Sequence, residues 1–299
     1  MNRLPSATRS ETVSTPPPPK KSKKGLWIGL GILLFLLCAI VGWFFFQSQT
    51  PKYLTYRNQE LPVLKGVPHN EYLPEQFFVN ENGYIGYQSN QTSAALGVDV
   101  SFYQQNIDWE LVADSGIEFA MIRLGYRGYS TGILKTDSTF EQNIQGATAA
   151  GLDVGIYFFS QATSILEAQE EAEYVLEVIR GYPIGYPVVF DWEFITSDDS
   201  ARTNTVDGAT ATECALAFCD LIAAAGYTPM VYFNQDMGYL FYQLDLLSHI
   251  PFWLAEYDQT PNFYYHFDMW QYTHTGTVPG IEGSVDLNLS FRDWSKPQK

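Results

Sequence analysis

Residues 186–194 read YPVVFDWEF, an apolar run that leads into two carboxylates, Asp191 and Glu193, on either side of Trp192. On a β-strand, side chains at positions i and i+2 point to the same face, so the two acids are expected to project into one cleft, roughly 6.6–6.8 Å apart along the chain. Two carboxylates this close raise the pKa of one of them. One acid can then stay protonated near neutrality while the other is charged, as glycosidic bond cleavage requires. A cation site, or pairing with arginine, would explain the same spacing without catalysis.

From Leu96 onward, short apolar runs alternate with helical patterns. Ser164 and Glu167 predict a capping box at the start of one helix, which Gly181 would end, and Thr210 predicts a similar start for a helix that ends before Gly226. Alternation of strands and helices favours a parallel sheet. The last three apolar runs follow one another too closely for long helices between them. Eight such runs across about 200 residues predict an α/β fold, a compact or incomplete TIM-like barrel.

Polar residues end the predicted strands, where barrels of this kind carry their active sites. Asp99 and Asp286 lie in strands that closure of the barrel would bring together beside Asp191 and Glu193. Four carboxylates at one rim are costly unless they do chemistry or hold a metal. The other residues at strand ends are Arg123, Tyr126, Tyr157, Tyr232, Asn234, Trp253, Tyr257 and Gln271. Because no zinc-spaced Cys/His cluster, P-loop or dinucleotide fingerprint occurs, the sequence predicts neither a metal nor another cofactor.

Seven motifs give the chain a specific resemblance to a known family. They are GVDVSFYQQNIDW (97–109), FAMIRLGYRGY (119–129), GLDVGIYFFSQA (151–162), YPVVFDWE (186–193), FWLAEY (252–257), MWQYT (269–273) and GSVDLNL (283–289). From about Leu96 to Phe291 the sequence closely resembles the glycoside hydrolase family 25 lysozymes, the Chalaropsis-type N-acetylmuramidases. The resemblance implies a flattened TIM-like barrel, (β/α)5 followed by three β-strands. It also implies hydrolysis of the β-1,4 bond between N-acetylmuramic acid and N-acetylglucosamine in peptidoglycan.

The resemblance also implies roles for individual residues. Glu193 would be the general acid, and Asp191 would orient the substrate N-acetyl group or stabilise the intermediate. Asp99 and Asp286 would complete the catalytic carboxylate cluster. The expected substrate-binding residues are Tyr126, Tyr157, Tyr232, Trp253, Tyr257 and Gln271. We favour a substrate-assisted reaction, because Asp191 neighbours the acid on one strand rather than facing it across the cleft, but retaining and inverting routes stay open.

Gly25–Phe46 predicts a transmembrane helix, because this uncharged stretch of 22 residues is long enough to cross a hydrocarbon core of about 30 Å. Trp27 and Trp43 lie near its two ends, where interfacial aromatic residues are favoured. Four lysines precede the stretch and one follows it closely, which places the N-terminus in the cytoplasm and the remainder of the chain outside, facing the cell wall. A cleaved signal peptide is the alternative, but the apolar run is longer than usual and no small-residue cleavage site follows.

Four regions are therefore expected: a disordered cytoplasmic tail (1–24), the transmembrane helix (25–46), an extracellular stalk (47–94) and a catalytic domain (95–295). Within the stalk, the sequence around Asn82-Gly83 predicts a β-hairpin. The formal net charge is −16, and six of the 17 basic residues precede residue 47, so the outer part is strongly acidic and should repel nucleic acid. The expected partners of this monomer are peptidoglycan glycan strands and the membrane.

Two other functions fit parts of the sequence. A non-catalytic, membrane-anchored peptidoglycan-binding protein would explain the tail and the anchor, but such a protein has little reason to keep the Asp191–Glu193 pair. A chitinase-like glycosidase would also use paired acids in a barrel. Analysis of the products from chitin oligomers and from peptidoglycan would distinguish the chitinase-like enzyme from a muramidase.

Overall fold

The computed structural model describes residues 28, 32–38, 40 and 52–294. The predicted tail, and most of the predicted transmembrane helix, lie outside the described residues. Residues 28, 32–38 and 40 of that helix are helical and exposed. Among the described residues, no helix combines the length and apolar character needed to span a bilayer. The chain divides into two compact units, Met1–Lys52 and Tyr53–Lys299, and the second contains all the strands of the described residues.

Eight strands close into a barrel in the order β5, β13, β12, β11, β10, β9, β8, β6, with β6 returning to pair with β5. Their bounds are β5 Ala95–Val100, β6 Phe119–Arg127, β8 Asp153–Ser160, β9 Val188–Trp192, β10 Pro229–Asn234, β11 Phe252–Ala255, β12 Met269–Gly276 and β13 Val285–Ser290. Neighbouring strands are parallel except β13, which is antiparallel to both β12 and β5. A short outer strand, β7 (Leu134–Thr136), extends the sheet beyond β6. The α/β barrel predicted from the sequence is confirmed.

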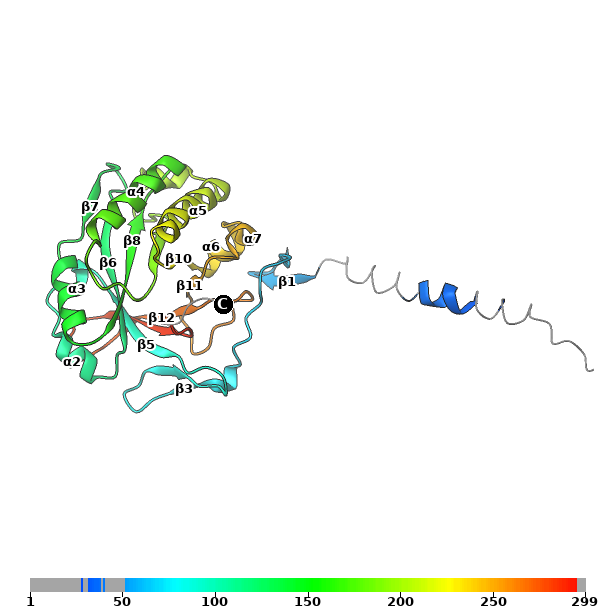
Figure 1. The fold of residues 1–299 in the computed structure, drawn as a ribbon, viewed down its shortest axis with the longest axis horizontal. Helices are drawn as coiled ribbons and strands as arrows, with labels where there is room; N and C mark the ends of the chain where they lie inside the picture. Colours follow the sequence, from blue (N-terminus) through cyan, green and yellow to red (C-terminus); the bar gives the residue numbers. More distant parts are fainter. Residues whose placement is uncertain (1–27, 29–31, 39, 41–51, 295–299) are drawn as a thin grey trace, which may run out of the picture. The chain divides into compact units, whose positions relative to one another are not determined.

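Helices follow the first five strands of the barrel and lie around its outside (Figure 1). They are α2 Trp109–Asp114, α3 Phe140–Ala149, α4 Ile165–Val178, α5 Gly208–Ala224, α6 Gln235–Leu240 and α7 Leu244–Leu247, with short 3-10 helices η1 Pro74–Gln76, η2 Phe102–Gln104 and η3 Arg202–Thr205. In the fully described stretch after β11, the strands β12 and β13 follow without an intervening helix. The chain thus has five strand–helix units and then three strands.

Local signals placed most helix ends correctly. Ser164 caps α4 by accepting a hydrogen bond from the Glu167 backbone N–H, and Gly181 follows this helix with φ +93°. The predicted start of α5 at Thr210 is wrong. Asp207 caps that helix by accepting from the backbone N–H of Thr210, so α5 begins at Gly208. Asp is as good a cap as Thr, and its position three residues earlier uses the first free N–H groups of the helix.

The N-terminal part of this unit contains two hairpins, β1 (Tyr53–Tyr56) with β2 (Gln59–Pro62) and β3 (Phe77–Val79) with β4 (Ile85–Tyr87). The second confirms the hairpin predicted around Asn82-Gly83. Tyr84 and Tyr87 are buried in the same hydrophobic core as the barrel, and the Phe77 ring meets the Trp270 ring edge-on at 5.5 Å. Residues 53–94, predicted as a stalk, therefore pack on the barrel, and Figure 1 shows β3 beside its lower edge.

The barrel interior is filled by inward-facing side chains from alternate strand positions. A separate buried cluster lies there, comprising Phe119, Met121, Tyr186, Val189, Met230, Tyr232, Trp253, Ala255 and Met269. Asp191 is two residues after Val189 on β9, and Gln271 is two residues after Met269 on β12. Because side chains at i and i+2 share a face, the next inward-facing layer toward the strand ends is polar. That layer forms the floor of a cleft.

Candidate active site

A cleft of about 860 Å³ opens at the carboxyl ends of the parallel strands. Its lining includes all ten predicted site residues: Asp99, Tyr126, Tyr157, Asp191, Glu193, Tyr232, Trp253, Tyr257, Gln271 and Asp286. Other residues complete the walls, among them Phe102, Tyr103, Arg123, Tyr129, Ser197 and His274. Asn234 instead caps α6 by accepting from the Met237 backbone N–H. The structure thus brings every predicted catalytic and substrate-binding residue to one site.

Asp191 and Glu193 lie at the end of β9, as the alternation predicts. Trp192 between them is fully buried on the other face, where its Nε1 donates to the Ala162 carbonyl oxygen at 2.9 Å. Asp191 is buried, while Glu193 is partly exposed in the cleft. Asp191 Oδ1 has no hydrogen-bond partner among the described residues. An unpaired buried acceptor beside a second carboxyl group is suited to receive a hydrogen bond from a ligand.

The two carboxyl groups have perturbed acidities. Burial raises the pKa of Glu193 to about 7, and the negative charge of Asp99 acts in the same direction, while a hydrogen bond with Asp191 opposes them. Burial raises the pKa of Asp191 well above its usual range, and the charge of Glu193 adds to this. The pair therefore holds a proton near neutral pH, and because the groups interact, its titration belongs to both.

A second carboxyl pair faces the first. Asp99 on β5 and Asp286 on β13 are directly opposite each other in the antiparallel register. Asp99 Oδ2 accepts from Gln271 Nε2 and from Asn288 Nδ2, both at 2.8 Å. Burial raises the pKa of Asp99, and the charge of Asp286 raises it further. Burial likewise raises the pKa of Asp286, which hydrogen bonding to Asp99 lowers in part.

Gln271 connects this pair to two tyrosines of the cleft wall. Its Oε1 accepts from the hydroxyl groups of Tyr232 and Tyr257, both at 3.0 Å. Tyr232 is nearly inaccessible, whereas the Tyr257 side chain is 52% exposed. Tyr232 therefore helps to fix the carboxamide, and the half-exposed Tyr257 ring, which packs against the His274 ring at 4.5 Å, is accessible from the cleft.

Trp253 has a similar supporting position. Its Nε1 donates to Asn288 Oδ1 at 2.9 Å, and its ring meets those of Tyr157 and Tyr232 edge-on. It is only 2% exposed, so it shapes the cleft floor rather than offering a broad stacking surface. Asn288 was not predicted as a site residue, although it is two positions after Asp286 and so lies on the same face of β13.

Arg123 also lines the cleft but was not predicted as a site residue. Of the described residues that line the cleft, it alone has a permanent positive charge. Its Nε and Nη2 lie 2.8 and 2.7 Å from Asp137 Oδ2, and its guanidinium group lies over the rings of Phe102 and Tyr126 at 5.0 and 5.6 Å. This charge lowers the pKa of Asp191 in opposition to burial. The sequence showed an arginine at a strand end, but not the distant acid that holds it.

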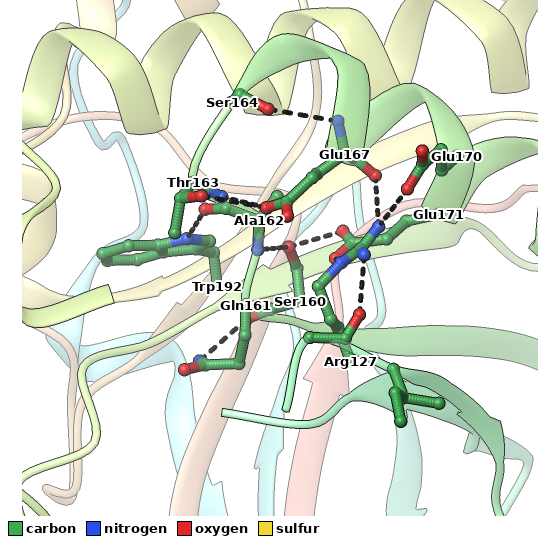
Figure 2. A network of polar contacts seen from close by, with 12 residues as sticks. Arg127, Ser160, Gln161, Ala162, Thr163, Ser164, Glu167, Glu170, Glu171 and Trp192 are labelled. Carbon is green, nitrogen blue, oxygen red and sulfur yellow. Dashed lines mark hydrogen bonds and ion pairs between the residues drawn. The ribbon is translucent and has the colours of Figure 1, made fainter. Parts of the chain in front are cut away.

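A buried polar network lies behind the Asp191–Glu193 strand (Figure 2). Gln161 Nε2 donates to the carbonyl oxygens of Ser160 and Glu193, both at 2.9 Å, and its Oε1 accepts from the Thr203 hydroxyl group at 2.9 Å. One side chain thus joins the end of β8, the backbone of the predicted acid and η3. Gln161 is fully buried and fixed by its contacts with Ser160 and Thr203, so its bond to the Glu193 carbonyl oxygen restrains the backbone at Glu193.

An ion pair supports this network from α4. Arg127 Nε donates to Glu171 Oε1 at 2.7 Å, and the Ser160 hydroxyl group donates to Glu171 Oε2 at 2.6 Å. Arg127 Nη2 also donates to the Glu167 carbonyl oxygen at 2.7 Å (Figure 2). Burial raises the pKa of Glu171 to about 7, although the hydrogen bonds and charge of its partners oppose this. Within the described residues, no group of three or more His, Cys, Asp or Glu side chains has the arrangement of a metal site.

Comparison with known proteins gives one consistent family. The sequence profile of the glycosyl hydrolases family 25 matches residues 98–281. The autolytic lysozyme of Clostridium acetobutylicum is 30% identical over 198 residues, which are 64% of this chain and 54% of that protein. Lysozyme M1 of Streptomyces globisporus is 27% identical over 212 residues, 66% of this chain and 68% of that protein. The chain thus matches about half the length of the Clostridium relative.

Solved structures agree with this fold. The structure of the CTP1L endolysin is 26% identical, with a TM-score of 0.54, and the match covers 67% of each chain. A family 25 glycosyl hydrolase from Bacillus anthracis is 23% identical, with a TM-score of 0.55 over 70% of this chain and 93% of that one. The barrel with its three final strands is therefore shared with these proteins.

Proposed function

The chain belongs to glycosyl hydrolase family 25 and is a glycoside hydrolase, and we propose that it is a membrane-anchored lysozyme. Its substrate would be peptidoglycan, and it would cleave the β-1,4 bond between N-acetylmuramic acid and N-acetylglucosamine. The observation that carries the proposal is the carboxyl pair at the end of β9, in which Glu193 is partly exposed and has a pKa of about 7. The names of the two curated relatives, an autolytic lysozyme and a lysozyme, support the substrate.

In the proposed reaction, Glu193 donates its proton to the glycosidic oxygen as the bond to the anomeric carbon breaks. A raised pKa suits this step, because the acid must be protonated at the pH at which it works. Asp191 would accept a hydrogen bond from the substrate N-acetyl group through its unpaired Oδ1 and hold that group near the anomeric carbon. The carbonyl oxygen of the N-acetyl group would bond to the anomeric carbon as the leaving sugar departs. Water would then attack that carbon, displace the carbonyl oxygen and give a proton to Glu193, which restores the acid.

Asp99 and Asp286 would act on the same substrate from the opposite wall. Asp99 is committed to Gln271 and Asn288, so its contribution is mainly electrostatic and positional. Asp286 is the more exposed member and could contact the sugar directly. The negative charge that this pair shares would stabilise positive charge that develops on the sugar ring in the transition state.

The anchor is part of the proposal. Residues 25–46 would hold the enzyme in the membrane with its N-terminus in the cytoplasm and its barrel facing the cell wall. The support is the uncharged apolar stretch and the lysines before it. Tethering would raise the local concentration of enzyme at the wall. Protease added to intact cells should digest residues 52–299 and spare the N-terminal tail; protection of the barrel would contradict this orientation.

The test of the activity is mass spectrometry of the products released from purified cell wall by the full-length chain. Fragments ending in reducing N-acetylmuramic acid are expected from the wild type and from Glu282→Gln, which changes an exposed carboxyl group away from the cleft. They should be absent with Glu193→Gln. If folded wild-type protein binds wall fragments but releases none, a non-catalytic receptor is the better interpretation. Release of fragments from chitin alone would indicate a chitinase-like enzyme.

A further inference from the structure

A second groove, of about 550 Å³, lies beside the catalytic cleft and shares Tyr257 with it. We call it the hairpin groove, because the turn between β3 and β4 forms one wall. The loop after β11 forms another wall, and the end of β12 forms the third. Its lining residues are Val79, Asn82, Gly83, Tyr84, Ile85, Tyr257, Asp258, Gln259, Tyr272, Thr273, Thr275, Gly276, Thr277 and Leu287.

The hairpin is held firmly in place against the barrel. Asn80 Oδ1 accepts from the backbone N–H groups of Asn82 and Tyr84 at 3.0 and 2.9 Å, which closes the turn. Asn82 Nδ2 then donates to the Ser115 carbonyl oxygen at 3.1 Å, and the Tyr84 hydroxyl group donates to the Thr277 carbonyl oxygen at 3.4 Å. Because Tyr84 is also buried, the groove is a preformed feature of the surface.

The chemistry of the groove suits a neutral sugar. Gln259 and Thr275 are exposed in it, and they present amide and hydroxyl groups that both donate and accept hydrogen bonds. Asp258 is the charged residue among its described lining residues, so nothing there favours an anionic ligand. Tyr257 supplies a half-exposed aromatic ring whose flat apolar surface suits contact with a sugar ring, although the His274 ring packs against it at 4.5 Å. Its hydroxyl group is fixed by Gln271.

Tyr257 makes the two hollows continuous. On one side its hydroxyl group reaches Gln271 and so the catalytic carboxyl pairs, and on the other its side chain lines the hairpin groove. The hairpin lies before residue 98, where the family match begins. A polymeric substrate bound in the cleft would extend over Tyr257 into the groove.

We propose that the hairpin groove is an additional subsite that binds an N-acetylhexosamine unit of the same glycan strand, beyond the units held in the cleft. This inference rests on the proposed function for the identity of the strand. Its consequence is a preference for long strands over short oligosaccharides, since only a long strand fills both hollows.

The test compares the full-length wild type with a groove variant, Gln259→Ala/Thr275→Ala. A matched control, Gln145→Ala/Thr148→Ala, removes the same two residue types from the exposed face of α3. Each protein is given a tetrasaccharide and long strands of alternating N-acetylglucosamine and N-acetylmuramic acid. Loss of about two hydrogen bonds predicts a fall of roughly 5- to 20-fold in kcat/KM on long strands for the groove variant. Its kcat/KM on the tetrasaccharide should match that of the wild type and the control.

A second experiment measures binding of the glycan strand and does not depend on hydrolysis. In the Glu193→Gln background, calorimetry should show tighter binding of an octasaccharide than of a tetrasaccharide, and the groove substitutions should remove that difference. An unchanged length dependence in both experiments would overturn the subsite. If no protein hydrolyses any strand but the length effect on binding disappears in the groove variant, the subsite stands and the proposed activity fails. If hydrolysis is normal and the groove variant keeps the wild-type preference, the subsite alone is wrong.

Discussion

Replacing Glu193 with glutamine should stabilise the protein at alkaline pH while removing its activity. The folded structure raises the pKa of this carboxyl group from its ordinary value of 4.5 to about 7. The folded state therefore binds the proton more tightly than the unfolded state, and stability is lost as the pH rises from about 4.5 to about 7. Glutamine does not ionise and does not incur this loss. The raised pKa that suits the proposed acid is thus maintained at the expense of stability.

The size of the effect follows from the two pKa values. Their difference of about 2.5 corresponds to roughly 3 kcal/mol in the free energy of unfolding, fully present above about pH 8 and absent below about pH 4. This is an upper value, because Asp191 shares the proton and adjusts when Glu193 is replaced. For a folded unit of this size, it corresponds to a rise of roughly 5–10 °C in the melting temperature.

The assay is denaturant unfolding of the full-length chain, kept in a mild detergent because of residues 25–46, at a series of pH values between 4 and 8.5. Glu193→Gln should match the wild type at pH 4 and become progressively more stable above it. Glu282→Gln, an exposed carboxyl group on the loop before β13, is the control for loss of a negative charge. A stability difference that is the same at pH 4 and pH 8, or a variant less stable than the wild type at pH 8, would refute the reasoning.

Three further outcomes are expected. The kcat of the wild type should fall about tenfold per pH unit above about 7, as Glu193 loses the proton it donates; a pH–rate profile measures this, and a flat alkaline limb would exclude that role. Gln161→Met removes both N–H donors that hold the Ser160 and Glu193 carbonyl oxygens, so kcat should fall by roughly tenfold with little change in KM, in a protein with wild-type circular dichroism. Arg127→Met leaves Glu171 buried without its ionic partner and should lower the free energy of unfolding by about 3–5 kcal/mol, whereas adding Glu171→Met should restore most of it; equal losses in the single and double variants would contradict the pairing.

The barrel and the candidate site at its rim could be predicted from the sequence because both depend on local periodicity. Alternation along a strand fixes which side chains share a face, so Asp191 and Glu193 had to lie together once β9 was recognised. Closure of eight strands then brings Asp99 on the first strand beside Asp286 on the last. The same two rules place Tyr232 and Gln271 at the rim.

What the sequence did not reveal are contacts between distant residues. Asn288 reaches Asp99 across 189 positions, and the guanidinium group of Arg123 is held by Asp137 from a separate loop. The packing of residues 53–94 against the barrel is of the same kind, since Tyr84 is buried in the core of the barrel and its hydroxyl group donates to the Thr277 carbonyl oxygen, 193 positions away. No local pattern encodes these partners. The hairpin itself was predictable from Asn82-Gly83, but its position beside the cleft was not.

The arrangement of the four acids explains how the cleft tolerates them. Arg123 pairs with Asp137 and lowers the pKa of Asp191, but its single charge offsets the four acids only in part. The acids instead form two hydrogen-bonded pairs, each with a buried member, Asp99 or Asp191, and a more exposed member. In both pairs burial is the largest cause of a raised pKa, so protons are retained where charge would be most costly. The cleft therefore holds protons rather than four negative charges at neutral pH. Asp191 and Glu193 share the proton of the β9 pair, and Glu193 is the member that opens into the cleft, where the proposed hydrolysis of a glycosidic bond would use it.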